Sequence, residues 1–600
     1  MLKICAWPLL CVLTLTSTVL AVDVVPDLVP SAVADRQRPL EPDQVRLQGW
    51  LGNRLVRTEQ TRLLDIEERI LLSCFQKRPG NQAWAGEHVG KYLHAATLAW
   101  VYTGDPRLRE KMDRVVGELL KTQMPDGYLG TYLEQDRWTA WDVWVHKYNL
   151  IGLLTYYRYT GHKPSLEACR RIGDLLCDTF GKDKRDIIKA GEHVGMAATS
   201  VLEPMVWLYR LTGDKKYLEF CEYILWAWEQ PHGPQILSSL REGKGVNQVG
   251  NGKAYEMLSN FVGLCELYRT TGRRELLEPV LTAWNDIVAR RLYITGSGSQ
   301  KEFFRDDYHL PNEPESHASE NCVTVTWMQL NIQLLRLTGE AKYADELERT
   351  AYNQISFSQK EDGSDFAYFS PLQGIKEFGH LGREIHCCLS SGPRGLALLP
   401  TVAYTIGDDG IHVNLFETGS ATISRDGRKI RVEQETLYPN HGHITVRADA
   451  PVRVRVPGWS AGGNATYRKL GQGAAPADAR IQGEVTYDVS PRPAIDEKAN
   501  AGRVAWLRGP LVLAADQGSN PNIGALPDVA LPTTPEALAF EAKPVDPREW
   551  PGQQVYHVHG CVAGKVTPLK MVPFGEVGRN GTYYQVWFEQ ADPACFRPQQ

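Results

Sequence analysis

Leu208-Tyr-Arg-Leu-Thr-Gly213 is one copy of a phrase that recurs along the chain, in which an aromatic residue or Leu is followed by a short spacer and Thr-Gly. Each copy comes after an apolar stretch with the 3.6-residue period of a helix. Because Gly suits the left-handed residue that closes a helix, each copy predicts a tight turn between two helices. The closing glycines are Gly104, Gly161, Gly213, Gly272 and Gly339.

The spacing of these glycines, 57, 52, 59 and 67 residues, fits one helical hairpin and a loop in each repeat. Consecutive hairpins must bury their apolar faces against neighbours. About six hairpins can close into an (α/α)6 toroid, and an open solenoid is the alternative. Long irregular loops, such as Thr295 to Ser319, favour the closed toroid with a pocket at one end.

After about Thr401 the period of the apolar residues changes from 3.6 to 2. Segments such as Ile411 to Glu417 and Val452 to Val456 alternate apolar and polar residues, as half-buried antiparallel strands do. The predicted fold class is mainly α with C-terminal β: an (α/α)6 toroid followed by one or two antiparallel β-sandwich domains. We place the toroid at residues 22–405 and the two sandwiches at residues 406–499 and 500–600.

The N-terminus, residues 1–21, is typical of a signal peptide. Lys3 supplies the positive end, Ile4 to Leu20 is largely apolar, and the small residues that precede Val22 offer a cleavage site. We therefore expect an exported protein, periplasmic or extracellular, without a membrane anchor. The net charge is −5, from 66 basic and 71 acidic residues with no basic stripe, which argues against a nucleic-acid partner. The oligomeric state does not follow from the sequence.

Twelve cysteines are present, and two of them would leave with the signal peptide. Five others lie among apolar neighbours in helix-like segments, where we expect buried free thiols. They are Cys74, Cys169, Cys177, Cys221 and Cys265. Cys561 and Cys595 have no assigned role, so Cys322, Cys387 and Cys388 are the informative set.

Glu320-Asn-Cys322 begins a predicted helix, and Cys387-Cys388 follows some 65 residues later. One Glu and three Cys form a possible four-ligand set for zinc. Adjacent cysteines suit a shared metal better than a strained disulfide between them. The spacing leaves buried thiols without metal equally open, and it does not distinguish a closed structural zinc from one that activates a thiolate nucleophile.

Glu302 lies on the long loop just upstream of this segment. Glycoside hydrolysis needs a proton donor for the leaving oxygen, and Glu302 is a candidate for that role. A loop carboxylate is more often simply solvated, so the residue type and position alone favour the solvated alternative.

Several segments together resemble the β-L-arabinofuranosidase family of glycoside hydrolases, family 127. The likeness runs in order from about Gln48 to about Tyr404 and continues weakly into the strands. Its motifs are Met124 to Tyr132, Tyr293 to Gly296, Glu302 to Asn312, Glu320 to Cys322, Ala341 to Asn353, Phe366 to Leu372, Cys387-Cys388 and Leu507 to Val512.

The resemblance implies a glycoside hydrolase with an (α/α)6 catalytic domain and zinc held by Glu320, Cys322, Cys387 and Cys388. It implies that Cys387 is the nucleophile, which forms a thioglycosyl intermediate with retention of configuration. Glu302 would protonate the leaving group and then activate water. Glu348 and Tyr368 match positions that touch the sugar.

The chain departs from the family where histidines are expected to line the pocket. His146 lies in the matching stretch without a fixed register, and His193 belongs to a repeated Gly-Glu-His-Val-Gly phrase that also occurs at 86–90. Lys253 stands where a histidine is expected, and Lys147 is close to His146. We include His146, His193 and Lys253 among the candidate substrate-binding residues. Lysines facing the sugar would favour a carboxylated substrate, whereas surface lysines would have no such meaning.

The leading hypothesis is an exported, zinc-dependent retaining exo-glycosidase that releases terminal β-L-arabinofuranose from plant-type oligo- or polysaccharides. The same machinery acting on an acidic pectin-type sugar is the second. A non-catalytic carbohydrate-binding protein with structural zinc is the third, and a vicinal-thiol redox switch without metal is the fourth.

Overall fold

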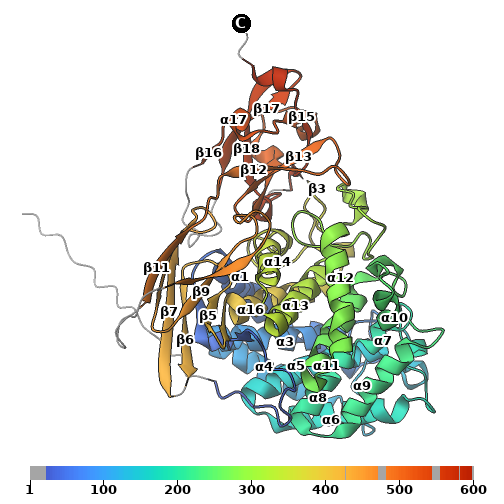
Figure 1. Cartoon of the computed structure of the whole chain (residues 1–600). Helices are drawn as coiled ribbons and strands as arrows, with labels where there is room; N and C mark the ends of the chain where they lie inside the picture. The colour runs from blue at the N-terminus through green and yellow to red at the C-terminus, as the bar shows by residue number, and fades with distance from the viewer. Residues whose placement is uncertain (1–21, 426, 471–480, 543–553, 580, 598–600) are drawn as a thin grey trace, which may run out of the picture.

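The computed structural model describes residues 22–425, 427–470, 481–542, 554–579 and 581–597, so the predicted signal peptide lies outside the described residues. Helices dominate residues 50–403, and strands dominate the described residues that follow, as the blue-to-yellow and orange-to-red parts of Figure 1 show. Among the described residues, no helix is long and apolar enough to cross a membrane.

Six inner helices form the ring of the toroid. Each packs on the next, and the last returns to the first, so the ring is closed and the predicted toroid is confirmed. The inner helices are α3 (Glu87–Thr103), α5 (Asp142–Thr160), α8 (Leu202–Thr212), α11 (Ala254–Thr271), α13 (Asn321–Thr338) and α16 (Cys387–Ala403). The outer helices are α1 (Trp50–Thr58), α4 (Pro106–Lys121), α6 (Lys163–Thr179), α9 (Lys215–Trp228), α12 (Leu277–Arg290) and α14 (Ala341–Arg349). Shorter helices are α2 (Glu68–Gln76), α7 (Met196–Thr199), α10 (Ile236–Arg241), α15 (Ser356–Ser358) and α17 (Pro535–Leu538).

The recurrent Thr-Gly phrase closes five of the inner helices, as the sequence predicts. Each closing glycine caps its helix in the left-handed region, with φ between 67° at Gly161 and 76° at Gly104. A side chain at these φ values would be strained, which explains why the phrase ends in Gly. All six inner helices therefore begin at one end of the toroid and finish at the other.

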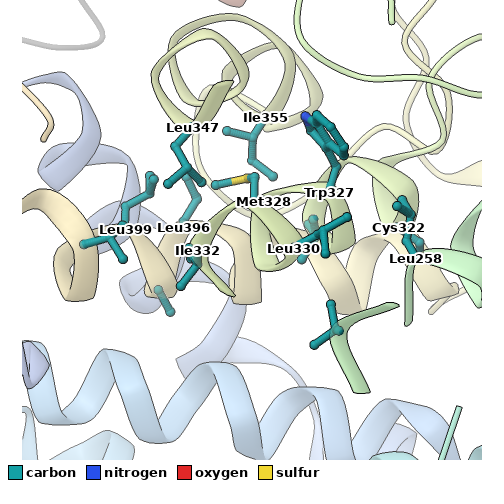
Figure 2. Close-up of a cluster of buried hydrophobic side chains, with 14 of the residues drawn as sticks. Leu258, Cys322, Trp327, Met328, Leu330, Ile332, Leu347, Ile355, Leu396 and Leu399 are labelled. Atoms are coloured by element: carbon teal, nitrogen blue, oxygen red, sulfur yellow. The ribbon is translucent and has the colours of Figure 1, made fainter. Parts of the chain in front are cut away.

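The hydrophobic core surrounds α13, which is buried along most of its length and carries both apolar and polar buried side chains. Figure 2 shows Trp327, Met328 and Leu330 of α13 among side chains of α14 and α16, with Cys322 in the same helix. Close packing of this kind fixes the rotation of α13, and with it the direction of its first turn.

An extended segment, residues 22–37, crosses the end of the toroid at which the inner helices finish; we call it the strap. Its backbone N–H groups donate to the last carbonyls of four helices. The bonds are Val25 to Arg158 (2.8 Å), Leu28 and Val29 to Arg210 (2.9 Å each), Val33 to Arg269 (3.0 Å), and Arg36 and Gln37 to Arg336 (2.7 and 3.2 Å). Helix C-termini leave carbonyls unpaired, so the strap satisfies groups that the helices cannot satisfy themselves.

Two aspartates of the strap pair with the same four arginines. Asp27 contacts Arg158 and Arg210 at 2.6 Å each, and Asp35 contacts Arg269 and Arg336 at 2.8 and 2.9 Å. A polar cavity of about 1070 Å³ lies at this end. The residues of the functional site described below do not line it.

Three sheets complete the molecule, and their ladders are antiparallel except for the pairs β5–β9 and β15–β20. The first holds β1 (Arg38–Pro39), β4 (Tyr404–Gly407), β5 (Gly410–Val413), β9 (Val452–Val456) and β10 (Thr466–Leu470). The second holds β2 (Val45–Leu47), β6 (Gly419–Arg425), β7 (Arg428–Thr436), β8 (His443–Ala448) and β11 (Ile481–Thr486). The third holds β3 (Gln373–Ile375), β12 (Pro491–Ile495), β13 (Arg503–Arg508), β14 (Leu511–Asp516), β15 (Val529–Leu531), β16 (Glu541–Ala542), β17 (Tyr556–Val562), β18 (Lys565–Pro573), β19 (Tyr583–Gln585) and β20 (Phe588–Gln590).

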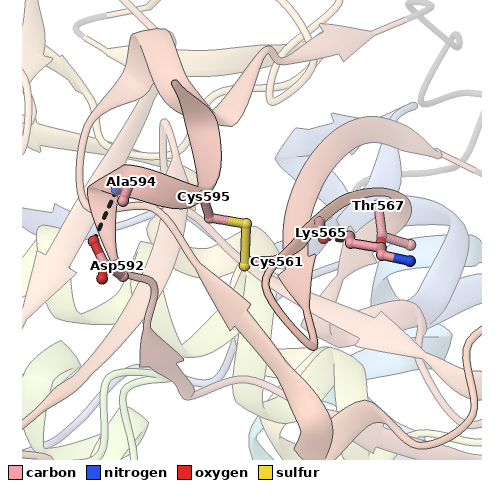
Figure 3. The surroundings of a disulfide bond; sticks show 6 residues. All are labelled: Cys561, Lys565, Thr567, Asp592, Ala594 and Cys595. Atoms are coloured by element: carbon pink, nitrogen blue, oxygen red, sulfur yellow. Dashed lines mark hydrogen bonds between the residues drawn. A yellow bond between two sulfur atoms is a disulfide. The ribbon is translucent and has the colours of Figure 1, made fainter. Parts of the chain in front are cut away.

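The sheets are tied to the toroid and to each other. Strands β1, β2 and β3 come from the part of the chain before residue 405, so each sheet contains a segment of the N-terminal region. Cys561 and Cys595, which the sequence left unassigned, form a disulfide that joins β17 to the segment after β20 (Figure 3). The five other cysteines expected as free thiols are free, and of these only Cys177 is not fully buried.

Candidate active site

The starts of two inner helices hold the cysteine cluster. Cys387 and Cys388 are the first residues of α16, whose N-cap is His386; the Nδ1 atom of His386 accepts the Leu389 N–H at 3.2 Å. Cys322 lies in the first turn of α13, and Glu320 is the N-cap residue of that helix. Helix N-termini carry partial positive charge, so this end of the toroid favours thiolates and carboxylates.

The four predicted ligands lie together. Their sulfur and oxygen ligand atoms are all within 4.8 Å of one another. The Cys388 sulfur is 3.5 Å from that of Cys322 and 3.9 Å from that of Cys387, and Oε1 of Glu320 is 3.9 and 3.8 Å from the sulfurs of Cys387 and Cys388. Tetrahedral zinc with Zn–S bonds of about 2.3 Å separates two sulfurs by about 3.8 Å. A disulfide would need about 2.05 Å, so the cluster has the spacing of a metal site.

The electrostatics of the cluster also fit a cation. Glu320 is buried, its Oε2 atom has no hydrogen-bond partner among the described residues, and burial raises the pKa of its carboxyl well above the ordinary range. Burial likewise raises the pKa of the Cys322 and Cys388 thiols. Hydrogen bonds from these two thiols lower the pKa of Cys387. A bound divalent cation would offset the cost of burying several anionic ligands together, so the residues present fit zinc.

Glu302 lies beside this cluster rather than in bulk solvent. Its carboxylate accepts a hydrogen bond from the Tyr368 hydroxyl at 2.8 Å and forms an ion pair with Lys253. Tyr368 also interacts with the Cys387 thiol and, after the larger effect of the two neighbouring thiols, helps to lower the pKa of that thiol. Tyr368 therefore links the candidate proton donor to the candidate nucleophile.

Lys253 stands among three acidic groups. Burial alone would lower the pKa of its ammonium, but the carboxylates of Glu256, Glu320 and Glu302 outweigh burial and raise it above the ordinary value. The Lys253 side chain is 7% exposed and that of Glu302 is 27% exposed, so a ligand can reach the pair from the Glu302 side. The sequence-based alternative of a surface lysine is thus excluded for Lys253.

Two predicted sugar contacts lie elsewhere in the fold. His146 is fully buried, and its ring nitrogens are bonded to the Leu129 N–H and the Asp142 carbonyl, so no ring atom is left for a ligand. Glu348 is buried where α14 meets the first two sheets. Its carboxylate accepts from Arg455 (2.5 Å), Tyr438 (2.7 Å) and Trp459 (3.1 Å). Both side chains are therefore used by the fold.

His193 is brought to the rim of the site. It is half-buried, and its Nδ1 atom lies 3.2 Å from the Asn251 side-chain amide. The other copy of its phrase has a different structure, because Glu87 and His88 open α3 and are both about 1% exposed. Lys147 is also buried, with its ammonium 4.1 Å from the centre of the Trp144 ring, so it is not a surface residue.

Strained backbone concentrates around the site. Of the fourteen described residues other than Gly with positive φ, ten lie in the three loops that precede α5, α7 and α13. They are Trp138, Ala140, His193, Val194, Ser299, Lys301, Glu302, Tyr308, His317 and Ser319. Such conformations persist where the surrounding structure imposes them, and they gather at functional sites. The sequence carries no signal for them, since none of these positions is Gly or Asn.

A second set of residues escaped the sequence analysis. Beneath the cluster, Lys91 forms a fully buried ion pair with Glu87 at 2.8 Å, and its Nζ atom is 3.5 Å from the Cys387 carbonyl. The Trp144 indole also donates to Glu87. The i,i+4 spacing of Glu87 and Lys91 could have suggested a helical pair, but not its position under Cys387.

A closed helical toroid that presents a carboxyl group and thiols where its helices begin has groups that glycoside hydrolysis can use, and comparison with known proteins gives the class and the family. Residues 39–401 match the family model described as "Beta-L-arabinofuranosidase, GH127 catalytic domain". This segment covers more than half of the chain, and the protein belongs to glycoside hydrolase family 127.

One curated relative and two solved structures show the extent of the likeness. A non-reducing end β-L-arabinofuranosidase of Bifidobacterium longum subsp. longum is 26% identical over 507 residues, which cover 72% of this chain and 75% of the relative. A GH127 β-arabinofuranosidase structure superposes with a TM-score of 0.77 at 22% identity, covering 94% of this chain and 99% of that one. The structure of a GH127 β-L-arabinofuranosidase from Geobacillus stearothermophilus T6 superposes with a TM-score of 0.75 at 21% identity, covering 91% of this chain and 100% of that one. At these identities the two structures establish the shared fold.

Proposed function

We propose that the protein is an exported, zinc-dependent retaining exo-glycosidase that releases terminal β-L-arabinofuranose from plant-type oligo- or polysaccharides. The observation that carries the proposal is the Glu302–Tyr368–Cys387 connection beside a four-residue cluster with zinc-like spacing. The curated relative is named for activity at the non-reducing end, which supports removal of a terminal sugar.

In the first step, the Cys387 sulfur attacks the anomeric carbon while the bond from that carbon to the leaving oxygen breaks. Glu302 donates its proton to the leaving oxygen, and a thioglycosyl bond to Cys387 remains. In the second step, Glu302 accepts a proton from water, the water oxygen attacks the anomeric carbon, and the sulfur departs. Two inversions give net retention. Tyr368 holds Glu302 in place throughout.

Glu320, Cys322, Cys387 and Cys388 would hold the zinc. Zinc would supply the positive charge that keeps the thiols deprotonated and makes sulfur a better leaving group. Lys91 and Glu87 support the position of the Cys387 backbone from below.

Export is supported by two independent features. The N-terminal residues have the pattern of a signal peptide. The Cys561–Cys595 disulfide is of a kind that persists in oxidising compartments and is rare in the cytosol. N-terminal sequencing of protein from the secreted or periplasmic fraction is expected to begin at Val22, and a full-length cytosolic protein would contradict export.

An acidic pectin-type substrate is the second candidate, and the Lys253–Glu302 ion pair favours it. The Lys253 ammonium is paired with the carboxylate of Glu302, which must transfer a proton in the first step. A substrate carboxylate could take over Lys253 and release Glu302 for proton transfer. Exclusive hydrolysis of carboxylated sugars would select this candidate and keep the mechanism.

The decisive experiment combines metal analysis of the purified protein with a panel of aryl glycosides that includes the β-L-arabinofuranoside and uronides. We expect about one zinc per chain and hydrolysis of the β-L-arabinofuranoside. Glu302→Gln should lower kcat/KM by about 10²- to 10⁴-fold while zinc content and melting temperature stay unchanged.

Each alternative has its own result in this experiment. Sugar binding without turnover in the parent would select the carbohydrate-binding protein with structural zinc. Protein without stoichiometric metal would exclude the zinc mechanism and select the thiol redox switch.

A further inference from the structure

Four rings form a row that leads away from Glu302; we call Trp84, Trp141, His193 and Phe303 the collar. Phe303 follows Glu302 directly in the chain. The ring centres are 6.0 Å apart from Phe303 to His193, 5.6 Å from His193 to Trp141, and 6.2 Å from Trp141 to Trp84. The row is therefore continuous, and it starts at the candidate proton donor.

The collar residues are half-buried, in contrast to the aromatic side chains directly below them. Trp144 is 1% exposed and lies 5.4 Å from Trp141, ring centre to ring centre, and its indole N–H is bonded to Glu87. The half-buried Trp141 thus packs against the fully buried Trp144, which holds it in place. Half-buried rings on such a base keep part of their apolar surface open to a ligand.

The loops that carry the collar are held in place by specific contacts. The Tyr132 hydroxyl accepts a hydrogen bond from the backbone N–H of Trp141 at 3.2 Å and donates one to the backbone carbonyl of Ala83 at 2.7 Å. It therefore connects the two loops that carry the tryptophans. The Arg383 guanidinium lies 5.6 Å above the centre of the Trp84 ring. Ala140 and His193 adopt left-handed φ values of 47° and 59°. Preorganised rings bind a ligand at a smaller entropic cost than mobile ones.

A second group of aromatic residues on the other side of Glu302 is less suited to a ligand. Phe369 is stacked flat on His317, with ring centres 4.6 Å apart and planes 6° apart, so one of its faces is covered. The Tyr368 ring is packed against His380, 4.0 Å away, and its hydroxyl is engaged with Glu302. The collar rings, by contrast, meet edge to face and do not stack flat on one another.

We propose that the collar is the subsite for the sugar on the leaving-group side of the scissile bond, with Trp141 and Trp84 as its specificity-determining residues. Glu302 delivers a proton to the leaving oxygen, so the leaving group must extend past Glu302, where the collar begins. Sugar rings present an apolar C–H face that packs on flat aromatic rings. This inference rests on the proposed function and adds the residues that bind the leaving-group sugar and select a sugar over a simple alcohol at that position.

The test compares two substrates that share the β-L-arabinofuranosyl group, the methyl glycoside and a disaccharide. Trp141→Ala and Trp84→Ala are expected to raise KM for the disaccharide by about 3- to 10-fold each, in line with about 0.5–1.5 kcal/mol for one aromatic contact. For the methyl glycoside, kcat/KM should stay within about twofold of the parent. Trp141→Phe and Trp84→Phe, which keep a ring, should restore most of the disaccharide affinity.

Trp226→Ala is the control, because Trp226 is an exposed tryptophan (40%) on outer helix α9, away from the site. It should leave the kinetics of both substrates unchanged. Equal losses on the two substrates, or no loss on the disaccharide in the Trp84→Ala, Trp141→Ala double variant, would overturn the inference.

A binding measurement separates this inference from the proposed function. Arabino-oligosaccharide is titrated into Glu302→Gln protein by isothermal calorimetry, with and without the two Trp→Ala changes. Weaker binding in the Trp→Ala proteins supports the collar even if the parent hydrolyses no arabinoside, in which case only the proposed activity fails. Unchanged binding overturns the collar even if the parent is active.

Discussion

The two ends of the toroid are built in opposite ways from the same six helices. At the strap end, helix carbonyls are paired with strap N–H groups, and four repeated arginines are paired with two aspartates. At the catalytic end, buried atoms such as Glu320 Oε2, His88 Nε2 and His386 Nε2 have no hydrogen-bond partner among the described residues. Left-handed residues also cluster in the loops there. The strap end pairs most of its helix carbonyls and arginines, although Arg210 Nε has no hydrogen-bond partner among the described residues, and the catalytic end retains unsatisfied groups that a metal and a substrate can use.

The largest expected effect lies at the catalytic end. Cys387→Ala removes the proposed nucleophile and should reduce kcat/KM by at least about 10³-fold. Cys177→Ala is the matched control, since Cys177 is also a half-buried free thiol but lies on outer helix α6. Its activity should equal that of the parent. Comparable losses in the two variants would contradict the assignment of Cys387 as the nucleophile.

Glu348 tests whether a residue that matches a sugar-contacting position acts at the site or in the fold. Glu348→Gln breaks the buried pair with Arg455 and should lower the free energy of unfolding by about 3–5 kcal/mol, measured by urea denaturation. Activity per folded molecule, measured well below the unfolding transition, should be retained. A loss of kcat/KM without a loss of stability would place Glu348 at the active site after all.

Acid should weaken the strap end. Burial alone would raise the pKa of Glu266, but Arg269, Arg336, Arg210 and a hydrogen bond from Gln333 outweigh burial and lower it from 4.5 to about 2. Because this folded-state pKa is depressed, its stabilising contribution is present above about pH 4.5 and is lost as the pH falls toward 2. Since one pKa unit corresponds to about 1.4 kcal/mol, the free energy of unfolding should fall by about 3 kcal/mol over this range.

Urea midpoints measured from pH 6 to pH 2.5 check this expectation. Glu266→Gln should be less stable than the parent at pH 6 and should lose less stability on acidification. If the urea midpoints of the two proteins fell in parallel with pH, Glu266 would not be responsible for the loss of stability in acid.

The smallest effect is expected from the strap itself. Asp35→Asn weakens the contacts with Arg269 and Arg336 and should lower the free energy of unfolding by about 2 kcal/mol. The control Glu278→Gln alters an exposed pair with Arg274 and should change it by less than about 0.5 kcal/mol. Both variants should keep the parental kcat/KM, and a catalytic defect in Asp35→Asn would show that the two ends are coupled.

The fold was largely predictable because its signals are local. Gly104, Gly161 and the other closing glycines mark helix ends by their backbone conformation alone. The change of period near Thr401 marks the point at which the chain passes from helices to strands, and β4 begins at Tyr404. The strap was not predicted, because its partners, such as Arg336, lie about 300 residues away and no local pattern announces them.

The candidate site was predicted where chemistry limits the residue type and was missed where geometry decides. Cys322, Cys387 and Cys388 stand out as a thiol at a predicted helix start and an adjacent pair, and Glu320 and Glu302 are candidates from their positions near them; the family resemblance then implies their roles. His146 and Glu348 matched by position, yet neighbours such as Asp142 and Arg455 use their polar atoms. Trp84 and Trp141 were missed, because an isolated tryptophan in a loop has no periodicity to show which way it faces.

The strap also sets the order in which the native contacts can form. Asp35 pairs with Arg336, 301 residues further along the chain, so the segment that leaves the ribosome first cannot dock until four inner helices exist. Its donors repeat with an interval of eight residues, from Val25, Leu28 and Val29 to Val33, Arg36 and Gln37, each trio serving two adjacent helices. Contacts of such long sequence separation form slowly. The strap therefore completes its contacts only after α13 has formed, when it joins the ends of four inner helices.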